Sequence, residues 1–378
     1  MKSLYIHIPF CKHKCFYCDF NSFSGADSLI DDYVKAIKRE ISIIAKEEKS
    51  FKTIYIGGGT PSFIDEKYIK EILGLVKSDG EITIEVNPGT VTREELISYK
   101  SLGINRLSIG LQTTNDYLLK RIGRIHSLKD FEETYKIARE IGFNNINVDL
   151  MFGLPEQKLV DVEESLNYLI KLNPEHISCY SLIVHDENVA KFPGVFSNLP
   201  SEDEERQMYY LICNKLKENG YVQYEISNFS KIGFESKHNL CYWNQEEYYG
   251  VGAGASSYIN GKRYTNESNL KEYIKRISEI EDETIEQVIS HVANIEEIQT
   301  IEDKIKEYMI LRLRLLDGVS ANDFHNKFGG NVLNYFKNEI EKLIQEGLLV
   351  KESSNDDILI HLSTKGLDLA NIVWEEFI

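Results

Sequence analysis

The sequence lacks any apolar run long enough to cross a membrane. Its longest runs are the length of a strand, as around residues 54–56, whereas a membrane-spanning helix needs about 20 apolar residues. The N-terminus also lacks the charged start, apolar middle and small-residue cleavage site of a secretory signal. We therefore expect a cytoplasmic protein, and the sequence leaves peripheral attachment to a membrane open.

Basic residues are too few and too scattered to form a nucleic-acid-binding face. The chain has 43 Lys and Arg against 60 Asp and Glu, a formal net charge of −17. An acidic chain repels nucleic-acid phosphates unless it carries a concentrated basic surface. We therefore expect no nucleic-acid partner.

The six cysteines do not form the pattern of a disulfide framework. Three lie within eight residues, and the other three, Cys179, Cys213 and Cys241, are far apart. Disulfide frameworks distribute their cysteines through small secreted chains. Clustered thiols in a long cytoplasmic chain indicate metal binding instead.

The first 185 residues alternate between strand-like and helix-like segments. The pattern predicts strands near residues 4–8, 53–56, 82–86, 106–109, 146–150 and 176–182. It predicts helices near residues 29–46, 66–76, 93–102, 128–141 and 160–172. The strands are rich in Ile and Val and read as apolar on both faces, which is typical of parallel strands covered by helices. This predicts an α/β fold, a partial (β/α)6 barrel.

The alternation ends near residue 186, which predicts three units: 1–185, 186–303 and 304–378. The middle unit contains short aromatic and Gly-rich segments, and its acidic stretch 278–303 predicts a helical linker. The last unit begins with an amphipathic helix, and a hairpin over 348–362 precedes a final helix. This predicts a smaller α+β, winged-helix-like domain, which we interpret as a lid or docking surface.

The three clustered cysteines form a C-x3-C-x2-C pattern at Cys11, Cys15 and Cys18. Thiolates are the usual ligands of iron–sulfur clusters. Three thiolates leave one iron of a [4Fe–4S] cluster open, and the amine and carboxylate of S-adenosylmethionine (SAM) can chelate it. A zinc site is the alternative, but zinc usually takes four ligands, and His13 would have to be the fourth. This spacing after a first strand resembles the radical SAM superfamily.

Polar and glycine residues follow the later strands. The segment from Gly57 to Pro61 lets its backbone approach a ligand closely, although a tight structural turn would also explain it. Arg124 could pair with the methionine carboxylate of SAM, and Asp149 could hold its ribose hydroxyls. Glu85 and Gln112 also lie at strand ends. Each could instead be a capping or surface residue.

Longer motifs narrow the resemblance. Residues 5–11 (YIHIPFC), 57–62 (GGGTPS), 110–113 (GLQT), 121–124 (RIGR) and 149–155 (DLMFGLP) resemble the oxygen-independent coproporphyrinogen III oxidase family. The similarity covers nearly the whole chain. It implies SAM contacts at Tyr5, Tyr17, Gly58, Gly59, Thr60, Glu85, Gln112, Arg124 and Asp149.

That family contains an oxidase and a heme-chaperone branch, HemW, and three features favour the chaperone. The oxidase has a further cysteine where this chain has Phe20, and it carries an N-terminal extension where this chain has ten residues before Cys11. Residues 238–243 (HNLCYW) match an H-N-x-x-Y-W motif that the resemblance links to heme binding. Imidazole is a common axial heme ligand, so we expect His238 to bind the iron, with Cys241 as a lesser candidate. A polar surface histidine beside a core tryptophan is the alternative.

The resemblance therefore implies a heme chaperone that binds heme, a [4Fe–4S] cluster and SAM. Its expected partners are heme-acceptor proteins, including membrane-bound respiratory proteins, and a homodimer is left open. Two alternatives remain: a radical SAM oxidase that decarboxylates coproporphyrinogen III, and an iron–sulfur scaffold that is not an enzyme.

Overall fold

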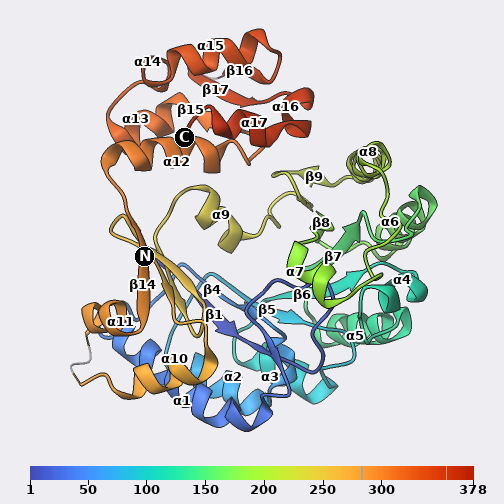
Figure 1. The fold of residues 1–378 in the computed structure, drawn as a ribbon, viewed down its shortest axis with the longest axis vertical. Helices are drawn as coiled ribbons and strands as arrows, with labels where there is room; N and C mark the ends of the chain where they lie inside the picture. The colour runs from blue at the N-terminus through green and yellow to red at the C-terminus, as the bar shows by residue number, and fades with distance from the viewer. Residues whose placement is uncertain (282–283, 355) are drawn as a thin grey trace.

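A twelve-stranded sheet forms the centre of the protein in the computed structural model, which describes residues 1–281, 284–354 and 356–378 (Figure 1). The strand order is β14-β13-β12-β11-β1-β4-β5-β6-β7-β8-β10-β9. Its six central strands are parallel neighbours, which confirms the expected partial barrel. They are β1 (Ser3–Ile8), β4 (Thr53–Gly58), β5 (Glu81–Val86), β6 (Arg106–Gln112), β7 (Ile146–Phe152) and β8 (His176–Ser181).

The helices between these strands agree closely with the sequence pattern. They are α1 (Ile30–Ile44), α2 (Glu66–Leu73), α3 (Arg93–Ser101), α5 (Leu128–Ile141) and α6 (Leu159–Leu172). A further short helix, α4 (Asp116–Arg121), was not expected. Its six residues are too few to show a helical period, and its visible signal is the N-cap Asn115, whose side chain accepts from the amides of Tyr117 and Leu118.

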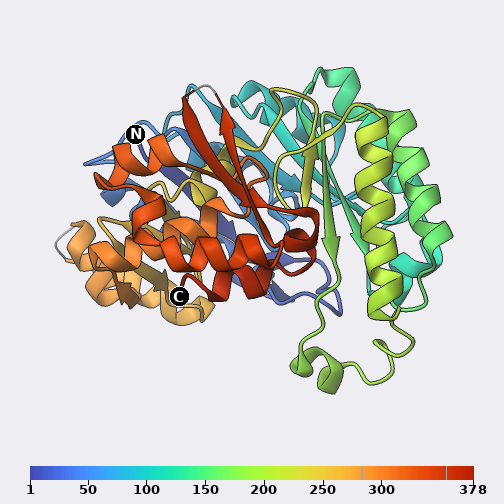
Figure 2. The ribbon, with the colours of Figure 1, turned by 90° about the horizontal axis from the view of Figure 1, so that it is seen from above.

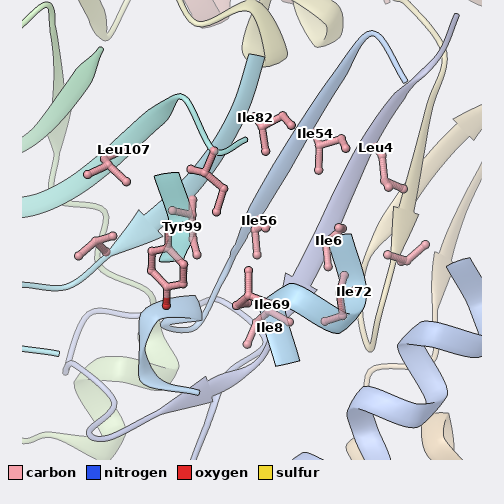
Figure 3. Packing of buried hydrophobic residues seen from close by; sticks show 14 of the residues in the cluster. Leu4, Ile6, Ile8, Ile54, Ile56, Ile69, Ile72, Ile82, Tyr99 and Leu107 are labelled. Carbon is pink, nitrogen blue, oxygen red and sulfur yellow. The ribbon is translucent and has the colours of Figure 1, made fainter. Parts of the chain in front are cut away.

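The two faces of the central sheet differ, which corrects the expectation that the strands are apolar on both. Ile6, Ile56 and Leu107 alternate with polar residues and pack on the outer face against α2 and α3 (Figure 3). The inner face instead carries residues such as Glu85 and Asn147, which line a cavity. Because successive side chains of a strand point to opposite faces, the apolar half forms the core and the polar half is left for ligands.

The middle of the chain extends the same sheet at both ends. Strand β11 (Tyr248–Val251) lies parallel to β1, and three antiparallel strands follow it outward: β12 (Ser256–Ile259), β13 (Lys262–Asn266) and β14 (Ala293–Ile298). At the other end, β10 (Asn228–Ser230) pairs with β8 and with β9 (Val222–Gln223). The division at residue 185 stays a prediction, since this sheet contains strands from both sides of it.

The acidic stretch 278–303 is not the helical linker that its composition suggests. It contains α11 (Ile285–His291) and then the edge strand β14, and its residues 282 and 283 lie outside the described part. The side chains of β14 are mostly exposed. An edge strand rich in glutamate lacks the apolar pattern of a buried strand, which explains why the sequence did not reveal it.

The connecting elements surround both faces of the sheet. They are β2 (Phe10–Cys11), β3 (Phe23–Ser24), η1 (Asp27–Leu29), η2 (Pro61–Phe63), α7 (Asp186–Lys191), α8 (Glu202–Glu218), α9 (Lys237–Trp243) and α10 (Leu270–Ser278). Helix α9 lies on the opposite side of the sheet from α1, α2 and α3, facing the C-terminal elements (Figure 1). Helices α6 and α8 lie side by side at one edge (Figure 2).

The C-terminal elements form a separate hydrophobic core, as expected for a smaller α+β domain. A three-stranded sheet of order β15-β17-β16 packs with the surrounding helices. The elements are α12 (Ile301–Arg312), β15 (Val319–Ser320), α13 (Ala321–Phe328), α14 (Val332–Tyr335), α15 (Lys337–Gln345), β16 (Leu349–Ser354), β17 (Asp357–Leu362), α16 (Thr364–Asp368) and α17 (Ala370–Glu375). Across the described residues, no helix combines the length and apolarity needed to cross a bilayer.

Candidate cluster site and ligand cavities

The three clustered cysteines lie on one anchored loop and line one cavity of about 380 Å³. All three thiols are free. The amide of Phe16 donates to the carbonyl of Ile122 at 3.1 Å, and the side-chain amide of Asn188 donates to the Phe16 carbonyl at 2.7 Å. The loop is therefore held in place from two other parts of the chain.

The three thiols are the candidate ligands of a metal group in this cavity. In the described part of the chain, no group of three His, Cys, Asp or Glu side chains is already arranged around one ion position, and this includes the three cysteines. A cluster is larger and takes each thiolate at a different iron. Glycine at position 59 leaves room for Cys11, because a Cβ there would lie 2.9 Å from its Sγ.

Eight of the nine residues expected to contact SAM line the same cavity, around the cysteines and the carboxyl ends of the strands. They are Tyr17, Gly58, Gly59, Thr60, Glu85, Gln112, Arg124 and Asp149. Tyr5 is the exception, and its expected contact with SAM stays a prediction. It lines a second cavity, and its ring stacks on Tyr55 of the first, with centroids 6.2 Å apart.

Glu85 fixes the glycine-rich end of β4. Its carboxylate accepts from the Tyr55 hydroxyl at 2.9 Å and from the Gly58 amide at 3.1 Å. Removal from water raises the pKa of Glu85 to about 7. Glu85 therefore shapes the cavity wall and can be neutral or charged toward a ligand near neutral pH.

Arg124 has donor capacity left for an anion. Its Nη1 donates to Asn87 Oδ1 at 2.8 Å, whereas its Nε is buried without a partner in the described structure. Its guanidinium lies over the Tyr17 ring, 5.9 Å from the centroid. A planar guanidinium with a free edge suits a carboxylate.

Gln112 occupies an unusual backbone position at the end of β6. Its φ is +70°, and the pairing register of β6 with β7 shifts between Gly110 and Gln112. Such bulges re-aim side chains near functional sites. The sequence motif marked Gln112 as a candidate but gave no sign of the bulge.

The histidine motif of α9 takes part in a chain of hydrogen bonds. His238 Nδ1 lies 2.7 Å from Thr53 Oγ1, which donates to Ser3 Oγ at 2.9 Å, and Ser3 Oγ lies 3.1 Å from Cys241 Sγ. The Cys241 thiol donates to the Lys237 carbonyl at 3.2 Å. These bonds attach α9 to β1 and β4.

The expected role of His238 as an axial heme ligand stays a prediction, and in this structure the ring is buried and hydrogen-bonded. The ring is 1% exposed, and its second nitrogen, Nε2, lies 2.8 Å from the Tyr242 hydroxyl. Burial lowers the pKa of His238 to about 3, so the ring is neutral. Because Thr53 donates its hydroxyl hydrogen to Ser3, Nδ1 donates to Thr53 and Nε2 accepts from the Tyr242 hydroxyl, so iron could bind Nε2 only if Tyr242 moved away. Cys241 is equally buried and bonded.

A second cavity, of about 550 Å³, lies beside the first and has aromatic walls. Tyr242 and Trp243 of the α9 motif line it, and Asp19 and Phe20 of the cysteine loop line both cavities. Its other lining residues include Tyr5, His7, Tyr248, Tyr258, Arg263 and Leu311. The sequence gave no sign of this cavity, because its walls come from β1, α9, β11, β12, β13 and α12.

Comparison with known proteins agrees with the fold and the motifs. Residues 5–169 match the Radical SAM superfamily, and residues 299–369 match the HemN C-terminal domain. The solved structure of coproporphyrinogen III oxidase (HemN) from Escherichia coli has a TM-score of 0.84 at 23% identity. That match covers 99% of this chain and 89% of the other, and at this identity it establishes a shared fold alone.

Curated relatives match over the full length. The chain is 41% identical to the heme chaperone HemW of Bacillus subtilis (strain 168), covering 100% of this chain and 99% of that one. It is 38% identical to the heme chaperone HemW of Lactococcus lactis, covering 100% and 97%. With the cysteine loop, the parallel sheet and the matching C-terminal domain, this similarity shows that the chain belongs to the HemW family within the radical SAM superfamily.

Proposed function

We propose that this chain is a heme chaperone, which binds heme and delivers it to acceptor proteins. The observation that carries the proposal is the full-length 41% identity to a curated heme chaperone. The aromatic cavity next to the histidine motif supports it, since it gives the chain a place for a flat ligand.

The cysteine loop is the proposed cluster site. Cys11, Cys15 and Cys18 would hold a [4Fe–4S] cluster, and Arg124 and Asp149 would orient SAM through its carboxylate and ribose. When bound, such a cluster supplies the electron that activates SAM. Glu85 and Asn87 keep the glycine-rich strand end and the Arg124 guanidinium in position.

The second cavity is the proposed heme site. Tyr242 and Tyr248 form a T-shaped ring pair with centroids 4.6 Å apart, and Trp243 lines the same walls. Ring faces favour contact with a porphyrin plane. Arg263 offers a cation for a propionate, although Glu307 now accepts from its Nε at 2.9 Å. The volume of about 550 Å³ falls within the usual range of small-ligand sites.

Anaerobic titration of the cluster-reconstituted protein with heme, followed at the Soret band, tests this proposal. We expect saturable one-to-one binding. Trp243→Ala should weaken it about tenfold, because a lost stacking face costs of order 1 kcal/mol or more. Metal-free protoporphyrin should bind almost as well as heme if ring faces hold the ligand. Absence of saturable heme binding in the unmodified chain would contradict the chaperone proposal itself.

Partners and location belong to the same proposal. Membrane-bound respiratory proteins are the proposed acceptors, with peripheral attachment at the membrane and a homodimer that forms with the cluster. Heme transfer from the loaded chain to detergent-solubilised apo-acceptor, followed by the acceptor's own spectrum, tests delivery. Sedimentation with and without the cluster tests the dimer.

Oxidase activity is the second candidate. It is favoured by the cavity, which brings the cysteine loop together with eight residues expected to contact SAM. Anaerobic incubation with SAM, a reductant and coproporphyrinogen III, with product detection by chromatography, decides between the two. Protoporphyrinogen IX formed with multiple turnovers would assign oxidase activity to the chain.

A further inference from the structure

Arg106, at the start of β6, is a buried cation without a hydrogen bond. Its side chain is 2% exposed, and its guanidinium donates to no other residue in the described structure. The nearest carboxylate oxygen, Glu81 Oε2, lies 4.0 Å from Nε. Burying a charge without hydrogen bonds is costly, so the folded protein keeps this group at a cost that an anionic ligand would offset.

The polar side chains around Arg106 form hydrogen bonds with one another and none with Arg106. Asn147 Nδ2 donates to Ser108 Oγ at 2.8 Å and to Asp149 Oδ1 at 2.7 Å. Because a carboxylate only accepts, this fixes the orientation of the amide. Asn147 Oδ1 then accepts from Ser178 Oγ at 3.0 Å and from His176 Nδ1 at 2.6 Å.

Glu81 is also engaged elsewhere. Its two carboxylate oxygens accept from the backbone amides of Lys237 and His238, each at 3.2 Å, at the first turn of α9. Arg106 is therefore left with one distant ion pair and a longer-range charge interaction with Asp149, and its Nε has no hydrogen-bond partner in the described structure.

Arg106 faces the cavity of the cysteine loop, but deep inside it. Arg106, Ser108, Asn147 and Ser178 line its inner part, and Asn239 of α9 lines it too. Arg106 and Gln112 are the first and last residues of β6, roughly 20 Å apart along an extended strand. The backbone of Arg106 therefore lies at the opposite end of β6 from Gln112, although the charges of both Arg106 and Arg124 act on Asp149.

We propose that Arg106 is the anion subsite for the carboxylate of a second ligand, bound in the sheet's inner cavity below the proposed SAM position. The guanidinium fork matches a carboxylate in a bidentate arrangement, and Ser108 and Ser178 provide hydroxyl groups beside it. The ligand class is a small or flat carboxylic acid. This site is separate from the aromatic cavity proposed for heme. A test that contradicts one of the two proposals therefore leaves the other unaffected.

The test uses cluster-reconstituted protein with SAM, and propionate as the probe. Saturation-transfer NMR measures propionate binding, and thermal unfolding measures stability. Arg106→Met removes the fork and keeps the bulk. Arg312→Met is the matched control, since Arg312 is 8% exposed but donates to Asn244 Oδ1 and to the Gly318 carbonyl, each at 2.6 Å.

We expect saturable propionate binding in the unmodified protein, weakened about tenfold or more in Arg106→Met, because the variant loses the charge-assisted hydrogen bonds to the carboxylate. SAM binding should be unchanged. The melting temperature should fall clearly in Arg312→Met and little in Arg106→Met, because the control loses formed hydrogen bonds.

Three results would overturn the proposal. The first is no propionate binding to the unmodified protein, or equal binding to Arg106→Met. The second is loss of SAM affinity in Arg106→Met, which would assign the arginine to the carboxylate of SAM. The third result applies if Arg106→Met does not fold. Arg106→Lys keeps the charge without the fork and should bind propionate more weakly, and binding at full strength would overturn the proposed bidentate contact of the guanidinium.

Discussion

His238 and Tyr242 hydrogen-bond each other within one turn of α9, with Nε2 and the phenol oxygen 2.8 Å apart. Two residues of the family's histidine motif are thus hydrogen-bonded to each other, and the other ring nitrogen of His238, Nδ1, is hydrogen-bonded to Thr53 Oγ1. The motif therefore positions α9 on the inner face of the sheet and presents Tyr242 and Trp243 to the aromatic cavity.

Replacing His238 by Ala should lower the free energy of unfolding by about 3 kcal/mol, because it leaves a void in a buried site and removes the hydrogen-bond partner of the Tyr242 hydroxyl. Urea unfolding measures this. His325→Ala, at an exposed position, should change the free energy by less than about 0.5 kcal/mol. An equally small effect at His238 would show that α9 does not depend on the motif.

The same histidine should make the protein less stable in acid. Its folded pKa of about 3 lies below the unfolded value near 6.5, so the unfolded chain takes up the proton first. Its contribution is present above pH 6.5 and is lost as the pH falls toward 3. Urea midpoints at pH 8 and pH 5 should differ less in His238→Gln than in the unmodified protein. Equal differences would contradict a neutral buried ring.

Glu40 should have the opposite pH dependence. Its carboxylate accepts from the Gly252 amide, the Tyr273 hydroxyl and the Asn266 amide, and burial raises its pKa to about 7. The folded state then holds the proton more tightly than the unfolded state, so stability falls as the pH rises from about 4.5 through 7. The change is up to about 3 kcal/mol.

Glu40→Gln tests this dependence by comparing urea midpoints with those of the unmodified protein across that range. Glu85 has a similarly raised pKa and remains in both proteins, so the difference between the two curves isolates Glu40. Parallel curves would show that Glu40 titrates at its ordinary pKa.

Gly58 should tolerate no side chain. Its φ is +118°, and a Cβ there would lie 2.6 Å from the His7 ring. Gly142 has φ +97° with nothing within 4 Å of the same position. Gly142→Ala should therefore cost about 1 kcal/mol from the backbone alone, and Gly58→Ala clearly more. Thermal unfolding of both variants checks the difference, and equal losses would mean that His7 moves freely.

Arg124→Gln should weaken SAM binding to the reconstituted protein about tenfold or more, because the amide cannot form the charged, two-pronged contact with a carboxylate. Equilibrium dialysis with labelled SAM measures the loss. Arg139→Gln is the control, since Arg139 is also partly buried but pairs with Glu175 far from the cysteine loop. Unchanged SAM affinity in Arg124→Gln would exclude the assigned role.

The sequence by itself determined the cysteine loop, the six parallel strands and the C-terminal hairpin. Each depends on residues close together in the chain: the spacing of Cys11, Cys15 and Cys18, the length of each apolar run, and the turn between two strands. It also indicated a shared pocket for Glu85, Arg124 and Asp149, and these residues line one cavity, because the carboxyl ends of parallel strands meet at one edge of a sheet.

Only the tertiary structure decided which polar side chains are free. A motif cannot show that both ring nitrogens of His238 are hydrogen-bonded, one to Thr53 and the other to Tyr242. Nor can it show that Arg106 lacks a hydrogen-bond acceptor. Each outcome depends on residues that are distant in the sequence. The edge strand β14 and the aromatic cavity likewise arise from segments brought together by folding. The hydrogen bonds and the burial of a side chain depend on the residues around it in space, and these residues lie far from it in the sequence.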